Sequence, residues 1–120
     1  MNDSKTTFAQ LKNVVKAFND EREWNQFHTP KNLSMKLSAE AAELMEIFTW
    51  CNSEESKEIV SQKMIEVQDE IADVVVLALC FANATGIDLA QAIENKITKN
   101  AQKYPVEKCK GRSNKYTEYK

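Results

Sequence analysis

The sequence predicts an all-α fold, a four-helix bundle within one domain, and three observations support this. Glycine and proline occur only twice each in 120 residues, which disfavours sandwiches and barrels because these folds need many tight turns. Apolar residues recur every three or four positions over long stretches, as they do on one face of a helix. A hydrophobic fraction of 42% supplies enough apolar side chains for one core of ordinary size.

The first two helices are expected over residues 7–23 and 33–51. The first carries apolar side chains at helical spacing, namely Phe8, Leu11, Val15 and Phe18. Pro30 disfavours helical backbone at the residue before it, and Asn32 is a suitable cap for the second helix.

A third helix, either straight or with a kink, is expected over residues 56–85, with Gly86 placed to end it in the left-handed conformation. Asp88 and Gln91 have capping-box spacing and predict the start of a fourth helix. Pro105 ends that helix, because proline interrupts helical hydrogen bonding.

The domain is therefore predicted to cover residues 1–105. Residues 106–120 are basic and without periodicity, so we interpret them as an irregular tail.

Charge and cysteine content exclude several classes of protein. The formal net charge is −2, so no overall field favours nucleic acid or a membrane as partner. The three cysteines form no CxxC pair and suit reduced thiols in a cytoplasmic protein. The N-terminus has no apolar signal segment. The longest apolar run, residues 74–82, is too short to span a bilayer and predicts a helix segment buried on all sides.

Glu40 occupies a core position of the second predicted helix. The apolar stripe of that helix consists of Leu33, Leu37, Leu44, Ile47 and Cys51. The position missing from this stripe is 40, so a carboxylate is expected to face the core. Glu43 lies three residues further on and hence on the same side, whereas Glu46 turns further round the helix.

The third helix repeats this arrangement with Glu70 and Asp73. These residues are three apart and flank an apolar stripe of Val67, Ile71, Val74, Ala78 and Phe81. Six acidic pairs share this spacing in a chain with 18 acidic residues, so the spacing alone mostly marks solvated faces. Only the placement beside apolar stripes singles out Glu40, Glu43, Glu70 and Asp73.

Four converging carboxylates need a counter-charge, because isolated buried carboxylates are costly and like charges repel. A hard divalent cation meets this need. Ligand sets made only of oxygen suit Mg²⁺, with Mn²⁺ as a substitute, rather than zinc. Since Mg²⁺ commonly shares its coordination with phosphates, the residues point to phosphate chemistry with one to three metal ions.

The same residues carry a resemblance to a known family. "EAAE" at 40–43 followed by "DEIAD" at 69–73 resembles the ExxE…ExxD signature of the MazG-like all-α nucleoside triphosphate pyrophosphohydrolases. Five further segments resemble the dCTP pyrophosphatase branch of this family: "FHTPKNL" (27–33), "LMEIFTW" (44–50), "DEIADVVVLAL" (69–79), "DLAQAIENKITKNAQKYP" (88–105) and "KYT" (115–117). The resemblance covers residues 8–117.

The resemblance implies Mg²⁺-dependent hydrolysis of a nucleoside triphosphate to the monophosphate and pyrophosphate. By the motif, Glu40, Glu43, Glu70 and Asp73 are the metal ligands and the catalytic carboxylates. Glu46 and Asp69 are candidates for assisting a metal-bound water or supporting the ligands, with plain surface salt bridging as the alternative.

A triphosphate also needs cations, and the fourth helix supplies a set of candidates. The predicted substrate-binding residues there are Lys96, Lys99, Asn100, Lys103 and Tyr104. Lys96 and Asn100 match family positions near the substrate, whereas the alternative is a basic last turn that complements the helix dipole. Lys31 is a further candidate in the loop before the second helix.

Trp24, His28 and Trp50 match family positions that line the nucleotide pocket. A tryptophan at a helix end otherwise lies in a core or an interface more often than against a ligand. We expect His28 to hydrogen-bond base or sugar, without proton transfer.

Base preference is left open by two departures from the branch. Ala41 and Ala42 stand where the branch often has glycine, and Leu77 replaces an aromatic residue of the eukaryotic enzymes. The first expectation is dCTP, with dATP, dUTP and modified dCTP open.

Two other readings compete with this enzyme. One is an acidic helical interaction module that binds a basic partner, which would not need carboxylates at core positions. The other is a related pyrophosphohydrolase that acts on another substrate, such as phosphoribosyl-ATP. The resemblance also implies a homo-oligomer, a tetramer built as a dimer of dimers.

Overall fold

The computed structural model describes residues 1–119, and these form α-helices and 3₁₀ helices but no strand. In chain order the elements are α1 (Phe8–Glu21), η1 (Trp24–Phe27), α2 (Pro30–Glu46), α3 (Ser53–Gln62), α4 (Met64–Thr85), α5 (Leu89–Lys103), α6 (Val106–Cys109) and η2 (Tyr116–Glu118). The all-α prediction is confirmed. The predicted number of helices is not, because the described residues form six α-helices instead of four.

The chain divides into two compact units, Met1–Gly86 and Ile87–Lys120. The first unit contains α1 to α4, and the second contains α5, α6 and η2. That one domain covers residues 1–105 stays a prediction.

Side-chain caps fix where the first helices begin. Thr7 and Gln10 form a reciprocal capping box at the start of α1. Thr29 caps α2 by accepting a hydrogen bond from the backbone N–H of Asn32, and Pro30 takes the first helical position, which its fixed φ suits. The predicted cap at Asn32 is therefore wrong, because the helix begins one turn earlier.

The third predicted helix is two helices, α3 and α4, which are separated at Lys63. This residue has φ −117° and ψ 33°, outside the helical region, and neither glycine nor proline marks the break. Gly86 caps α4 with φ 72°, as predicted, in a conformation that a side chain disfavours.

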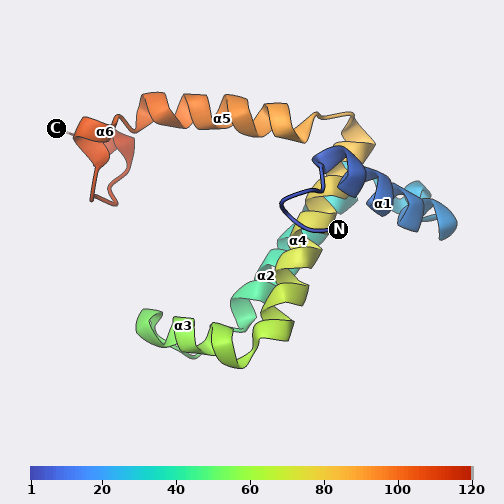
Figure 1. The fold of residues 1–120 in the computed structure, drawn as a ribbon, viewed down its shortest axis with the longest axis horizontal. Helices are drawn as coiled ribbons and strands as arrows, with labels where there is room; N and C mark the ends of the chain where they lie inside the picture. Colours follow the sequence, from blue (N-terminus) through green and yellow to red (C-terminus); the bar gives the residue numbers. More distant parts are fainter. Residues whose placement is uncertain (120) are drawn as a thin grey trace. The chain divides into compact units, whose positions relative to one another are not determined.

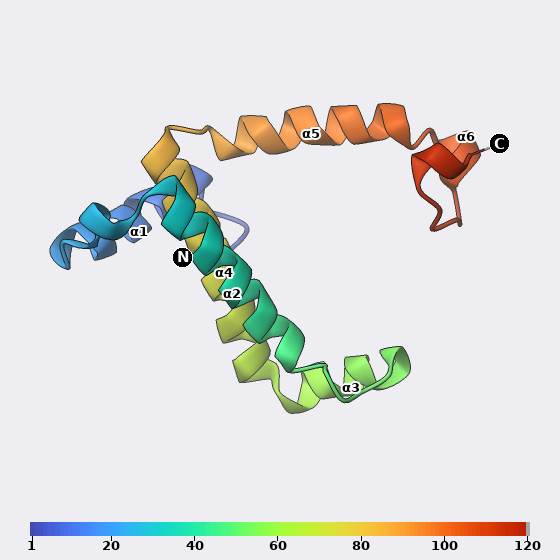
Figure 2. The ribbon, with the colours of Figure 1, turned by 180° about the vertical axis from the view of Figure 1, so that it is seen from behind.

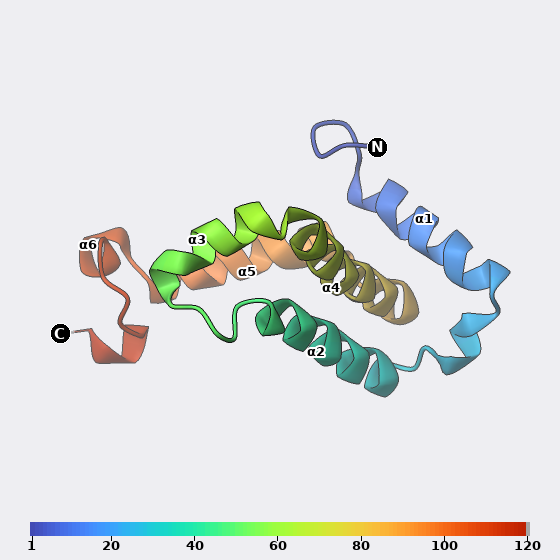
Figure 3. The same ribbon diagram turned by 90° about the horizontal axis from the view of Figure 1, so that it is seen from below.

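The core of the first unit lies around α4. Figures 1 and 2 show α2 and α4 side by side and antiparallel, and Figure 3 shows α4 between α1 and α2. The buried apolar residues are Val15 on α1, Leu33 on α2, and Leu79, Cys80 and Ala82 on α4. The extensive α2–α4 contact brings the two predicted acidic pairs onto neighbouring helices.

The apolar run of α4 is not buried on all sides within one chain. Val75, Val76 and Ile71 are exposed, the last to 46%, although Ile71 was predicted to lie in the core stripe. The buried face of α4 is narrower than the predicted apolar stripe, because α1 and α2 cover only part of the circumference of this helix. No single helix among residues 1–119 is long and apolar enough to cross a membrane, although α4 and α5 taken together meet that criterion by length and composition.

In the second unit, Asp88 caps α5 by accepting a hydrogen bond of 3.0 Å from the N–H of Gln91, as predicted. The region after Pro105 was predicted to be irregular, but it contains α6 and η2. The ring of Tyr104 contacts those of Tyr116 and Tyr119 edge to face, with centroids 5.9 and 6.0 Å away. These aromatic contacts order the segment against the end of α5.

Candidate metal centre

Among residues 1–119, Glu40 is the only charged residue that is buried, with 7% of its surface exposed. It lies on the side of α2 that faces α4, as its position in the apolar stripe predicted. Burying a carboxylate is costly unless a partner compensates its charge. The surroundings of Glu40 therefore decide what this position does.

Three of the four predicted metal ligands converge. Glu40, Glu43 and Glu70 each offer one carboxylate oxygen, and these oxygens lie within 4.8 Å of one another. Glu70 is half-buried, whereas Glu43 is exposed at the mouth of the group. Asp73 is exposed, on the turn of α4 after Glu70, and does not belong to this group. We call Glu40, Glu43 and Glu70 the carboxylate cluster.

Two oxygens of the carboxylate cluster are buried without a hydrogen-bond partner among the described residues. They are Oε2 of Glu40 and Oε2 of Glu70, one from each of the two antiparallel helices. Buried polar atoms are nearly always satisfied in folded proteins, so an unpartnered pair needs an explanation. A bound cation provides one, because carboxylate oxygens are its natural ligands.

The charges within the cluster repel each other. The pKa of Glu43 is raised above its usual value, chiefly by Glu40 and then by Glu70. One cation offsets part of this repulsion, since Nζ of Lys36 lies 3.1 Å from Oε1 of Glu40, one turn earlier on α2. The negative charge of the cluster is thus concentrated and only partly balanced by protein groups.

The other acidic candidates lie on the surface. Glu46, the last residue of α2, and Asp69 on α4 are both exposed, and neither belongs to the carboxylate cluster. Their assisting roles stay predictions.

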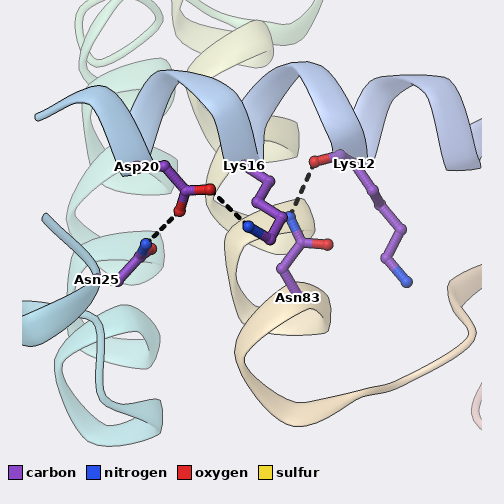
Figure 4. A network of polar contacts seen from close by, with 5 residues as sticks. All are labelled: Lys12, Lys16, Asp20, Asn25 and Asn83. Carbon is purple, nitrogen blue, oxygen red and sulfur yellow. Dashed lines mark hydrogen bonds and ion pairs between the residues drawn. The ribbon is translucent and has the colours of Figure 1, made fainter. Parts of the chain in front are cut away.

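A polar pocket of about 340 Å³ lies between α1, η1 and the end of α4. Its lining is Lys16, Asn19, Asp20, Asn25, His28, Cys80, Asn83 and Ala84. Figure 4 shows part of the wall, where Asp20 pairs with Lys16 and Asn25, and Asn83 donates to the backbone carbonyl of Lys12. Lys16, followed by Asn25, holds the pKa of Asp20 below its usual value. The pocket thus offers several amide and charged groups to a polar ligand.

This pocket lies on the same face of α4 as Asp73. Cys80 follows Asp73 by seven residues, which is close to two helical turns and a rise of about 10 Å. Asp73, which lies outside the carboxylate cluster, and the pocket are therefore on one face of α4.

The predicted nucleotide residues of the first unit differ in their surroundings. His28 is half-buried and lines the polar pocket, and its ring meets that of Trp24 edge to face at 6.5 Å. Trp24 also contacts Phe18, with ring centroids 5.7 Å apart. Trp50 is 96% exposed in the turn after α2, and Lys31 is exposed in the first turn of α2.

The remaining predicted substrate residues belong to the second unit. Lys99 and Lys103 line a pocket of about 470 Å³ together with Tyr116 and Tyr119, and Nζ of Lys103 lies 5.1 Å from the ring centre of Tyr116. Asn100 is half-buried, whereas Lys96 and Tyr104 are exposed. Substrate binding by these five residues stays a prediction.

The structure adds two features that the sequence prediction missed. Lys36 precedes Glu40 by four residues, a spacing at which opposite charges pair on a helix. Asn19 follows Leu11 and Val15 at four-residue intervals, so it occupies a core position as Glu40 does. Both signals were present in the sequence.

Comparisons with known proteins agree on one family. The model of the MazG-like family matches residues 35–119. The mouse and human proteins called dCTP pyrophosphatase 1 are 33% and 32% identical over 114 residues, which is 93% of this chain and 67% of each relative. A crystal structure of a pyrophosphatase from Archaeoglobus fulgidus superposes with a TM-score of 0.80 at 37% identity, covering 88% of this chain and 98% of that one. The resemblance seen in the sequence is thereby confirmed.

Proposed function

Because the chain belongs to the MazG-like family, we propose that it is a pyrophosphohydrolase of (deoxy)nucleoside triphosphates. It converts the substrate to the nucleoside monophosphate and pyrophosphate. Its role is to remove unwanted nucleotides from the cytoplasmic pool or to balance that pool. The reaction depends on Mg²⁺, for which Mn²⁺ can substitute.

The observation that carries this proposal is the pair of buried, unpartnered oxygens in the carboxylate cluster. Oε2 of Glu40 and Oε2 of Glu70 come from two different helices and lie beside Glu43. A cluster whose ligands are all carboxylate oxygens fits a hard cation such as Mg²⁺ and does not suit zinc. When bound, the metal supplies charge neutralisation for the triphosphate and an activated water.

The side chains divide the remaining tasks. Glu40, Glu43 and Glu70 hold the metal, and Asp73, on the neighbouring turn of α4, is the fourth ligand. Glu46 is a candidate for accepting the proton of the attacking water, because it follows Glu43 by three residues on α2.

The polar pocket is suited to the nucleoside. It lies about two helical turns beyond Asp73 on one face of α4, a span that a triphosphate chain and a sugar can bridge. His28 lines it with a half-buried ring, so this side chain can hydrogen-bond base or sugar. The amide and charged groups of the pocket would determine which base is bound. The first choice of substrate is dCTP, which the names of the mouse and human relatives support.

Exposed apolar surface supports a homo-oligomer, a tetramer assembled as a dimer of dimers. Ile71 and Val75 lie one turn apart on α4 and are exposed in the single chain, as are Val14 and Phe18 on α1. Contiguous apolar patches of this kind commonly mark protein interfaces.

A substrate panel tests the function. Purified protein is incubated with the four dNTPs, the four NTPs, 5-methyl-dCTP and phosphoribosyl-ATP, each with Mg²⁺ and with EDTA, and pyrophosphate and orthophosphate are assayed separately. We expect pyrophosphate from dCTP with Mg²⁺ only. Pyrophosphate from phosphoribosyl-ATP alone would move the enzyme to another substrate class. Absence of pyrophosphate from every substrate would leave the acidic interaction module as the better reading.

A further inference from the structure

Lys36 places a cation against the carboxylate cluster from within the same helix. Its Nζ lies 3.1 Å from Oε1 of Glu40, and its side chain is 61% exposed whereas that of Glu40 is 9% exposed. The ammonium therefore stands at the solvent side of the cluster and covers one oxygen of the buried carboxylate. The other oxygen of Glu40 is left without a partner among the described residues.

The influence of Lys36 extends beyond Glu40. Glu43 follows Lys36 by seven residues, close to two helical turns, so both side chains lie on the same face of α2. The ammonium therefore stands on the face of α2 that carries two of the predicted metal ligands. In the metal-free protein it takes the place of part of the missing positive charge.

Two opposite effects on metal binding are conceivable, and their sizes decide between them. By holding Oε1, Lys36 could orient Glu40, but an i,i+4 ion pair whose lysine is 61% exposed shifts an equilibrium only a few-fold. A divalent ion held by Glu40 would share that carboxylate with the ammonium, and the repulsion of a divalent and a monovalent cation at such short range shifts binding on the order of tenfold even at the dielectric constant of water. Repulsion is the larger effect.

We propose that Lys36 is a built-in counter-ion of the carboxylate cluster, which weakens the binding of free divalent metal and makes tight metal binding depend on the negative charge of the substrate. The triphosphate offers the ammonium a second anionic partner, so metal and nucleotide bind more tightly together than separately. This inference rests on the proposed function, because it needs a metal at Glu40, Glu43 and Glu70.

The test is calorimetric titration of the full chain with Mn²⁺, without nucleotide and then with a non-hydrolysable dCTP analogue. The variants are Lys36→Met and Lys36→Gln, which remove the charge, and Lys36→Arg, which keeps it. Lys57→Met, on the exposed surface of α3, is the control with the same change in net charge.

We expect Lys36→Met and Lys36→Gln to bind Mn²⁺ about tenfold more tightly than the wild type when nucleotide is absent. The analogue should raise their Mn²⁺ affinity by a smaller factor than it raises that of the wild type. Lys36→Arg and Lys57→Met should match the wild type in both titrations. In EDTA, both neutral variants should melt at a lower temperature than Lys57→Met, because the cluster has lost its counter-charge.

Unchanged or weaker Mn²⁺ binding by both neutral variants would overturn this inference, and weaker binding would assign Lys36 to orienting Glu40 instead. In that case the metal site of the proposed function would still stand, because the wild type binds. If the wild type binds no Mn²⁺ with or without the analogue, the metal site itself is overturned, and this inference falls with it.

Discussion

Nδ2 of Asn19 on α1 donates a hydrogen bond of 3.3 Å to Sγ of Cys80 on α4, and both side chains are buried. This contact joins two helices at the wall of the polar pocket. A buried amide costs free energy unless its hydrogen bonds are made. Asn19 therefore occupies a core position of α1 where an apolar side chain would cost less, and we attribute this choice of residue to its place in the pocket wall.

Asn19→Ala is expected to lower the free energy of unfolding by about 1–3 kcal/mol, since a buried hydrogen bond and packing volume are lost. If the pocket binds the nucleoside, KM for dCTP should rise more than kcat falls. Urea unfolding and steady-state kinetics measure the two effects. Asn13→Ala, at an exposed position of the same helix, is the control. An unchanged KM would place the nucleoside elsewhere.

Glu43 should make the metal-free protein less stable as the pH rises. Its pKa in the folded state is raised above the usual 4.5, chiefly by Glu40. Its contribution to stability is thus fully present below pH 4.5 and is lost as the pH rises through the raised pKa. Glu43→Gln should therefore gain stability over the wild type at pH 7 and gain less at pH 4, measured by urea unfolding in EDTA. A gain that is the same at both pH values would contradict this account.

Gly86→Ala should destabilise the first unit by about 1–2 kcal/mol, because Gly86 caps α4 with φ 72°. Nothing lies within 4 Å of a Cβ added there, so the cost comes from backbone conformation rather than from a clash. Gly86→Asn should cost less, because asparagine tolerates this conformation better. Thermal unfolding of the two variants checks the order. Equal effects would point to a cause other than φ.

Val75→Glu should dissociate the proposed homo-oligomer, because it places a charge in the exposed apolar surface of α4 that we propose as its interface. Light scattering coupled to size exclusion measures the mass. Gln68→Glu adds the same charge at an exposed polar position of the same helix and should leave the mass unchanged. A wild-type protein that is monomeric at all concentrations would refute the interface.

Local patterns in the sequence were sufficient for several features of the structure. The apolar stripe of α2 predicted that Glu40 is buried. The preference of glycine for the left-handed conformation predicted that α4 ends at Gly86. The position of the break at Lys63 was not predicted, because neither glycine nor proline marks it.

The site shows the same division between local and tertiary information. The i,i+3 spacing and the apolar stripes pointed to Glu40, Glu43 and Glu70, which converge, and to Asp73, which lies outside the cluster. Which oxygens are left without a partner depends on the packing of α2 against α4, and no local pattern encodes that.

The central claim is that the carboxylate cluster holds the metal for pyrophosphate release. It is tested most directly by the rate at which Glu40→Gln releases pyrophosphate from dCTP in Mg²⁺, with Glu58→Gln, at an exposed position of α3, as the control that removes the same charge. Loss of a metal ligand removes several kcal/mol of transition-state stabilisation, so we predict a fall of about a hundredfold or more for Glu40→Gln. Circular dichroism should show that its helices are kept. A folded Glu40→Gln protein with wild-type activity would contradict the account.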